Sequence, residues 1–222
     1  MAHWEHRPEA NWQKFRFNQP YAKGLKRLRE DVLAKTDFDP ATLWQWGTMQ
    51  AMAVVGILEA CEREFGEAGQ KVVYDALQKV GYDVGRQILE GASWPEEMTE
   101  AEFVSFFATV INRIVYASLE APKIDGAEQV SFDILWCPHQ DHYKAFDCRV
   151  QRYFVQGILD AARDFAGRFG FQVRFDSTIP AGAETCHFTL WKPTEEERLA
   201  WEEYTKQLER KALVKLRKNR DA

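Results

Sequence analysis

Apolar residues recur with helical spacing through the first half of the chain. Such stripes, with a repeat near 3.6 residues, occupy segments 23–34, 42–65, 68–90 and 99–112. In the second segment, LWQWGTMQAMAVVGILEACEREF, the middle is apolar on nearly every side. This pattern is typical of a buried central helix. The first half therefore predicts a group of helices, with segment 42–65 at its centre.

Glycine and capping residues refine this picture. Gly81 and Gly85 lie in the apolar stripe of the third segment, where each costs about 1 kcal/mol of helix propensity relative to alanine. Close packing against another helix compensates for this cost, and close approach of a ligand is the alternative. Thr99 with Glu102, and Thr194 with Glu197, have the spacing of a capping box, so a helix is expected to begin at each threonine.

The hydrophobic period changes after the helices. β-Branched and aromatic runs predict four strands, the first two separated by an Asp-Gly turn signal, and long helical segments follow each pair. The fold class is therefore α+β, with N-terminal helices, an antiparallel sheet in β-β-α-β-β order and a C-terminal helix. We expect one domain, 1–222, with four parts: an N-terminal arm (1–21), a helical part (22–114), a sheet part (115–191) and a final helix (194–218). The predicted strands are 114–120, 129–137, 171–176 and 185–191, and a helix at 143–168 separates the two pairs.

Composition and charge exclude several classes of protein. The 222 residues are 45% hydrophobic and carry a net charge of −5, which fits a globular protein with no general affinity for nucleic acid. No apolar stretch reaches the ~20 residues needed to span a bilayer. Phosphate-binding glycine loops, GxSxG and HExxH are all missing, which argues against a kinase or a standard α/β-hydrolase.

The cysteine content and the polar N-terminus bear on localisation. Four cysteines are too few for a disulfide framework in a chain of this length, and the first residues lack the apolar core of a secretory signal. We therefore expect a cytoplasmic protein with reduced thiols.

The most suggestive chemistry follows the second predicted strand. Cys137, His139, His142 and Cys148 offer four soft or borderline donors within twelve residues, a set that resembles zinc ligation, and manganese is a second candidate. A helix N-terminus beside this segment would lower the pKa of a nearby thiol. In the alternative interpretation the two histidines are exposed in a loop and the thiols pack as small hydrophobic groups.

A second thiol and imidazole are adjacent in the last strand. Because successive strand residues point to opposite faces, Cys186 and His187 cannot face the same pocket. The pattern predicts that Cys186 faces the core, either as packing or as a thiol lining an apolar cavity. Asp133 shares a strand face with Ser131 and Leu135, which favours a solvent-facing side chain. The alternative is an inward carboxylate whose pKa is raised by burial and which could act as a general base.

Three short motifs resemble one known family. They are Cys137-Pro138 at a strand end, Cys148 ahead of a helix, and the Gly-Ala-x-x-Cys-x-Phe sequence of residues 182–188. Over residues 128–191 the chain is similar to the L-2-amino-thiazoline-4-carboxylic acid hydrolase family, and more distantly to 4-vinyl reductase-type domains.

This resemblance implies hydrolytic opening of a small cyclic amidine, the thiazoline ring, to give a carbamoyl-cysteine. Such a reaction needs a nucleophile, a proton donor and a cation for the substrate carboxylate. A bound metal that activates water would replace the thiol nucleophile, and the sequence leaves both routes open. The implied residues are Cys137, Cys148 and Cys186 as nucleophile or metal ligands, His139 or His142 as acid and base, and Arg149, Arg152, Trp136 and His187 for substrate binding.

Two other functions are compatible with the sequence. The first is a non-catalytic small-molecule sensor, with a cavity lined by aromatic residues such as Trp44, Phe106 and Phe107. In the second, the cysteines are structural and function lies in homo-oligomer contacts through the N-terminal arm and the last helix.

Overall fold

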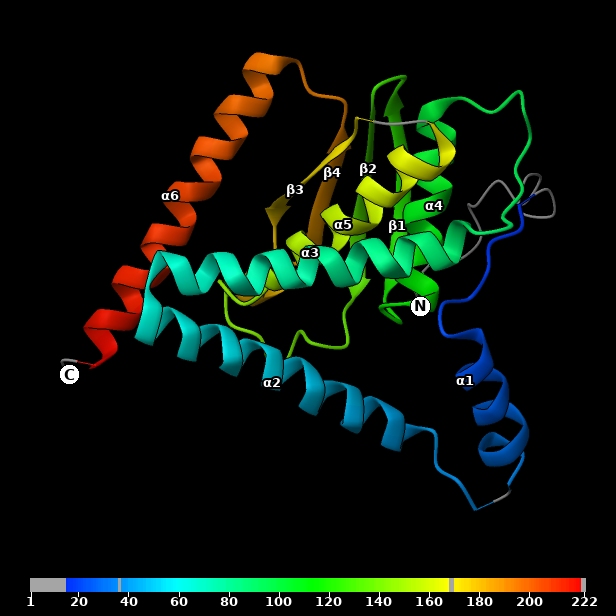
Figure 1. Cartoon of the computed structure of the whole chain (residues 1–222), viewed down its shortest axis with the longest axis horizontal. Helices are drawn as coiled ribbons and strands as arrows, with labels where there is room; N and C mark the ends of the chain where they lie inside the picture. Colours follow the sequence, from blue (N-terminus) through cyan, green and yellow to red (C-terminus); the bar gives the residue numbers. More distant parts are fainter. Residues whose placement is uncertain (1–14, 36, 168–169, 221–222) are drawn as a thin grey trace.

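A four-stranded antiparallel sheet and the helices stacked on it make up the architecture (Figure 1). The computed structural model describes residues 15–35, 37–167 and 170–220. The separate helical part and antiparallel sheet confirm the predicted α+β class. In chain order they are α1 (Ala22–Arg27), the π-helix η3 (Leu28–Leu33), α2 (Ala41–Phe65), α3 (Glu67–Leu89), α4 (Glu100–Ile114), β1 (Leu119–Gly126), β2 (Gln129–Trp136), α5 (Arg149–Ala166), β3 (Gln172–Ser177), the 3-10 helix η4 (Ile179–Ala181), β4 (Cys186–Trp191) and α6 (Glu195–Arg220).

The sheet has the order β1-β2-β4-β3, and every neighbouring pair is antiparallel. The predicted first strand, 114–120, is wrong, because α4 continues to Ile114 and β1 begins only at Leu119. Packing of Val110 and Ile111 in the core holds this stretch as helix although β-branched residues follow. Pro122 lies within β1, where it is tolerated because β1 is an edge strand.

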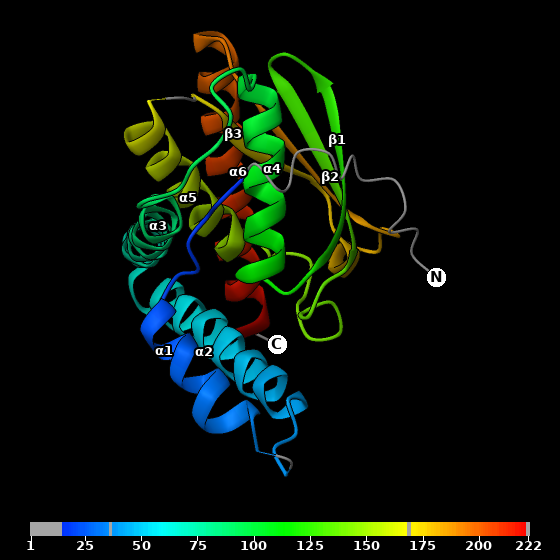
Figure 2. The same ribbon diagram turned by 90° about the vertical axis from the view of Figure 1, so that its right-hand side faces the viewer.

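Three layers follow from this sheet (Figure 2). Helices α4 and α5 pack on one face of the strands, and α3 packs on the outer side of α5. A Cβ on Gly81 would overlap the backbone of Phe154, and a Cβ on Gly157 would overlap the backbone of Gln78. The glycines of α3 therefore serve close helix packing, as expected, and they bring α5 into a fixed position above the sheet.

Helix α2 is peripheral, so the prediction of a buried central helix is wrong. Of its residues only Val55, Leu58 and Glu62 are buried, whereas Trp46 is 60% exposed and Ile57 57% exposed. One side packs against α3, and the opposite side faces solvent (Figure 1). Apolar residues on all sides of a helix predict burial. They do not show whether the covering surface belongs to the same chain, and in α2 only one side is covered by this chain.

The predicted N-terminal arm is described only from residue 15 onward. Phe15 is buried and stacks on Phe106 with ring centroids 4.5 Å apart, and Arg16 pairs through its backbone with Ser93. This part of the arm therefore lies across the body of the same chain. The prediction for residues 1–14 falls outside the described residues, and the expected homo-oligomer stays a prediction.

Both capping boxes form as predicted. The Thr99 side chain accepts the amide of Glu102, and that of Thr194 accepts the amide of Glu197. Among the described residues, no helix combines the length and the apolar character that crossing a membrane requires.

Candidate active site

Three cysteines that are distant in sequence line one cavity. Cys137 follows β2, Cys148 precedes α5 and Cys186 begins β4, yet all three border a space of about 80 Å³ between the sheet and helices α4 and α5. Most of the other lining side chains are aliphatic or aromatic, Phe132 and Leu159 among them. The convergence of thiols that the proposed chemistry needs is therefore present in the fold.

Strand alternation explains which neighbours join this cavity. Cys186 is 4% exposed and faces inward, while His187 faces the other side of the sheet. There Nδ1 of His187 lies 3.0 Å from Oδ1 of Asp133, which also accepts a hydrogen bond from the Thr185 hydroxyl. The expected split between Cys186 and His187 is confirmed, and the suggested substrate contacts of His187 and Trp136 are not part of this cavity.

The position of Cys148 depends on where α5 begins. The predicted start near residue 143 is wrong, because residues 137–148 form a series of turns and the helix begins at Arg149. Cys148 is therefore the N-cap of an 18-residue helix, where the helix field favours a thiolate. Burial dominates, however, and together with the neighbouring Cys186 and Cys137 it raises the pKa of Cys148 to about 12. The thiol is therefore protonated at neutral pH and needs a base.

His139 is suited to be that base. It lines the cavity, stacks on Tyr143 with ring centroids 4.8 Å apart, and its buried Nδ1 has no hydrogen-bond partner among the described residues. Burial, reinforced by His142, lowers the pKa of His139, so its imidazole is neutral at pH 7. His142 itself lies against Trp44 and does not line the cavity.

Two tyrosines in the cavity were not anticipated from the sequence. The hydroxyl of Tyr116 is buried and lacks a hydrogen-bond partner among the described residues, and Gln151 donates a 3.2 Å hydrogen bond to the hydroxyl of Tyr143. Burial raises the pKa of Tyr116 well above its usual value and that of Tyr143 to about 12. Both groups therefore remain protonated donors. Tyrosine is common in cores, so nothing in the sequence pattern marks these two positions.

A second pocket, of about 210 Å³, adjoins the cavity and shares Cys148 and Phe175 with it. Arg149 and Arg152 both line this second pocket. Arg149 is already engaged, since its Nη2 lies 2.7 Å from both carboxylate oxygens of the buried Glu62.

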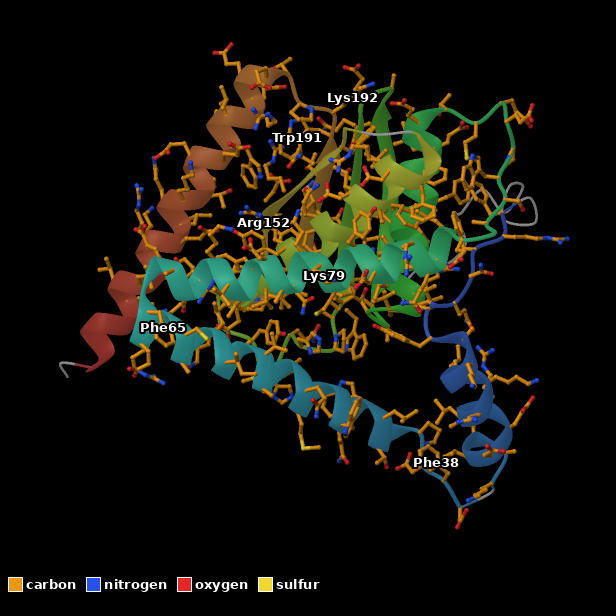
Figure 3. The ribbon with its side chains drawn as sticks, viewed as in Figure 1. Phe38, Phe65, Lys79, Arg152, Trp191 and Lys192 are labelled. Carbon is orange, nitrogen blue, oxygen red and sulfur yellow. The ribbon has the colours of Figure 1, made fainter. Side chains whose placement is uncertain are left out.

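Arg152 is placed differently. It extends from α5 toward α6 (Figure 3), with its guanidinium 5.0 Å from the ring centre of Tyr153 and 5.4 Å from that of Trp201. Burial lowers the pKa of Arg152, and the nearby carboxylate of Glu209 opposes this shift. Glu209 also accepts a hydrogen bond from Tyr153. Arg152 is thus a partly compensated cation at the edge of a pocket that reaches Cys148.

The predicted metal ligands do not form a metal site in this arrangement. Cys137, His139 and Cys148 line the cavity, but within residues 15–35, 37–167 and 170–220 no group of three or more His, Cys, Asp or Glu side chains is placed to hold a metal ion. As arranged here, the donor set therefore does not fit zinc or manganese.

The fold and the cavity define an α+β protein with a thiol-lined site between its sheet and its helices. A family model described as L-2-amino-thiazoline-4-carboxylic acid hydrolase matches residues 46–190. The chain belongs to this family, which confirms the resemblance drawn from the motifs and extends it to helices α2 to α4.

Two further comparisons place the chain among known proteins. A protein of Archaeoglobus fulgidus, described as uncharacterized, is 55% identical over 217 residues, covering 96% of each chain. The crystal structure of a trafficking protein particle complex subunit 3 from Naegleria fowleri, covalently bound to palmitic acid, covers 66% of this chain and 95% of its own, with 11% identity and a TM-score of 0.42.

Proposed function

We propose that the protein hydrolyses a C–N bond in a cyclic amidine carboxylate of the thiazoline type, with Cys148 as the nucleophile. One observation carries the proposal: Cys148 borders both the cavity that contains His139 and the pocket that contains Arg152. A base and a carboxylate anchor thus lie on two sides of one thiol. Family membership supports the reaction type.

In the first step, Cys148 attacks the substrate while His139 and Tyr116 transfer protons. His139 is neutral at pH 7 and takes the Cys148 proton as the sulfur attacks the amidine carbon. The bond between that carbon and the ring nitrogen then breaks. The nitrogen leaves as an amine with protons supplied by the imidazolium and the Tyr116 hydroxyl, leaving the amidine carbon bound to Cys148.

Water completes the cycle. His139 deprotonates a water molecule that attacks the carbon bound to Cys148, and the carbon–sulfur bond to the enzyme breaks. The imidazolium returns a proton to the thiolate, the hydroxyl on the attacked carbon returns one to the Tyr116 oxygen as it becomes the carbonyl, and the product is the S-carbamoyl amino acid. Overall, one substrate molecule and one water molecule give one S-carbamoyl amino acid, and no oxidant or reductant is consumed. Arg152 holds the substrate carboxylate during both steps, since a guanidinium matches a carboxylate in shape and charge.

The test is ring opening of 2-amino-thiazoline-4-carboxylate by the purified protein, followed by mass spectrometry of the product. We expect turnover by the wild type and a loss of about 10³-fold or more in Cys148→Ser, because removing a catalytic nucleophile leaves only binding effects. Cys61→Ser is the matched control, since Cys61 lies in α2 and does not line the cavity. Unchanged activity of Cys148→Ser would reject Cys148 as the nucleophile, and no turnover by the wild type together with a co-purifying apolar molecule would favour the sensor instead.

A further inference from the structure

A large apolar groove lies beside the thiol cavity. Its volume is about 640 Å³, and its walls come from α2, α3, α5 and the segments 115–117 and 138–143. The groove and the cavity share four residues: Tyr116, His139, Tyr143 and Gln151. The two spaces are therefore neighbours on either side of one wall, which contains the proposed base.

The cavity and the groove differ in volume, and this difference indicates which part of a substrate each can bind. The inner cavity of about 80 Å³ has room for only a few water-sized groups. The groove falls in the size range of small-molecule sites, roughly 300–1,000 Å³. A ring attacked by a cavity thiol therefore lies near the shared wall, and any substituent on the outer side of the ring extends into the groove.

Unpaired polar atoms point to a ligand in this region. Thr48 Oγ1, Tyr116 Oη and His139 Nδ1 are buried and have no hydrogen-bond partner among the described residues, and all three belong to residues that line the groove. Buried polar groups are normally satisfied, so a bound molecule is expected to supply the missing partners. Tyr116 and His139 lie in the shared wall, where the nitrogens of an amidine would meet them.

The groove itself is built for an apolar group. Val80, Leu77 and Phe154 line it, and Trp44 closes one side while its indole N–H donates a 3.3 Å hydrogen bond to the carbonyl of Pro138. This bond ties α2 to the turn segment that carries His139. Trp44 and Val80 are 43% and 47% exposed in the chain alone, and an apolar ligand would cover them.

We propose that the substrate of this site is a cyclic amidine carboxylate that carries an apolar substituent, an aryl or short branched alkyl group, bound in this groove. The inference rests on the proposed hydrolase function and adds a substrate class to it. Arg152 binds the carboxylate, and Cys148 faces the amidine carbon. The groove binds a substituent on the amidine side of the ring, away from the carboxylate.

Two glycines of α2 provide a matched test. A Cβ at Gly47 or at Gly56 would meet no atom within 4 Å, so the helix accepts a side chain at either position, but only Gly47 lines the groove. The probes are 2-amino-thiazoline-4-carboxylate and 2-anilino-thiazoline-4-carboxylate, the same ring with a phenyl group on the exocyclic nitrogen. We measure kcat/KM for both probes in the wild type, Gly47→Leu and Gly56→Leu.

In the wild type and Gly56→Leu we expect the phenyl probe to be favoured by about tenfold or more, the usual effect of filling an apolar pocket. In Gly47→Leu the ratio should fall to about one, because the leucine occupies the space of the phenyl group. Equal kcat/KM values in the wild type, or a preference that survives in Gly47→Leu, would overturn the inference while leaving the hydrolase proposal intact.

Failure of the hydrolase proposal is recognised separately, because the wild type would then open neither ring. The groove is still tested in that case by binding of both probes to Cys148→Ser, measured by calorimetry with and without Gly47→Leu. A phenyl preference that Gly47→Leu removes supports the groove as a binding site, and equal affinities for the two probes reject it.

Discussion

The carboxylate of Glu62 in α2 accepts hydrogen bonds from Nη2 of Arg149 in the first turn of α5, with both distances 2.7 Å. The Glu62 side chain is fully buried, and it also accepts a 2.7 Å hydrogen bond from Gln70. This ion pair fixes the residue next to Cys148, so it connects the peripheral helix α2 to the candidate nucleophile.

Replacing Glu62 with glutamine should destabilise the protein. The half-buried Arg149 would lose its counter-charge, and breaking a pair whose carboxylate is fully buried costs about 3 kcal/mol. Urea denaturation gives the change in the free energy of unfolding. Asp75→Asn is the control, because the Lys71–Asp75 pair is exposed and such pairs contribute about 0.5 kcal/mol or less. Similar losses in both variants would contradict a special role for the buried pair.

The contact between α3 and α5 predicts a second stability effect. Gly81→Ala places a methyl group against the backbone of Phe154, which should lower the free energy of unfolding by about 2 kcal/mol or more through overpacking. Gly56→Ala in α2 has open space around the new methyl group and should raise it by up to about 1 kcal/mol. Thermal unfolding of the two variants checks the opposite signs.

The pH dependence of turnover should follow His139. Burial lowers the pKa of His139 below its usual 6.5, and the base must be neutral to work. We therefore expect kcat/KM to be constant around pH 7 and to fall only below about 6.5 as the imidazole is protonated. His139→Asn should be slow at every pH and lack this limb. An acid limb centred above pH 7 in the wild type would contradict the assignment.

The cavity thiols should react slowly with alkylating agents in the folded protein. Burial raises the pKa of Cys137, Cys148 and Cys186, so little thiolate is present at pH 7.5. Iodoacetamide labelling followed by mass spectrometry should show slow modification of these three, and fast modification in urea. Rapid labelling of one cavity thiol in the native state would mean that it is ionised without substrate.

Tyr116→Phe tests the proposed proton donor. Loss of a general acid should lower kcat by about 10²-fold with a smaller effect on KM. Tyr82→Phe is the control, since Tyr82 bonds Asp164 and does not line the cavity. A normal kcat in Tyr116→Phe would contradict this role, and the imidazolium would then be the sole proton donor to the departing nitrogen.

Local patterns predicted the elements that local physics controls. The capping boxes at Thr99 and Thr194 formed because a cap depends only on the residues of one helix turn. The inward direction of Cys186 followed from strand alternation, a property of the backbone itself. The start of β1 and the start of α5 were misplaced, because packing against other elements decides how far a helix runs.

By itself the sequence determined the α+β order, the packing of α3 through its glycines and the family of the chain. Only the tertiary structure decided that α2 is peripheral, that Arg149 is engaged by Glu62 while Arg152 borders the site, and that Tyr116 joins the thiols. The physical reason is the separation along the chain of the residues that interact. Periodicity and capping act over a few residues, whereas burial and charge pairing depend on neighbours that the chain brings together only when it folds.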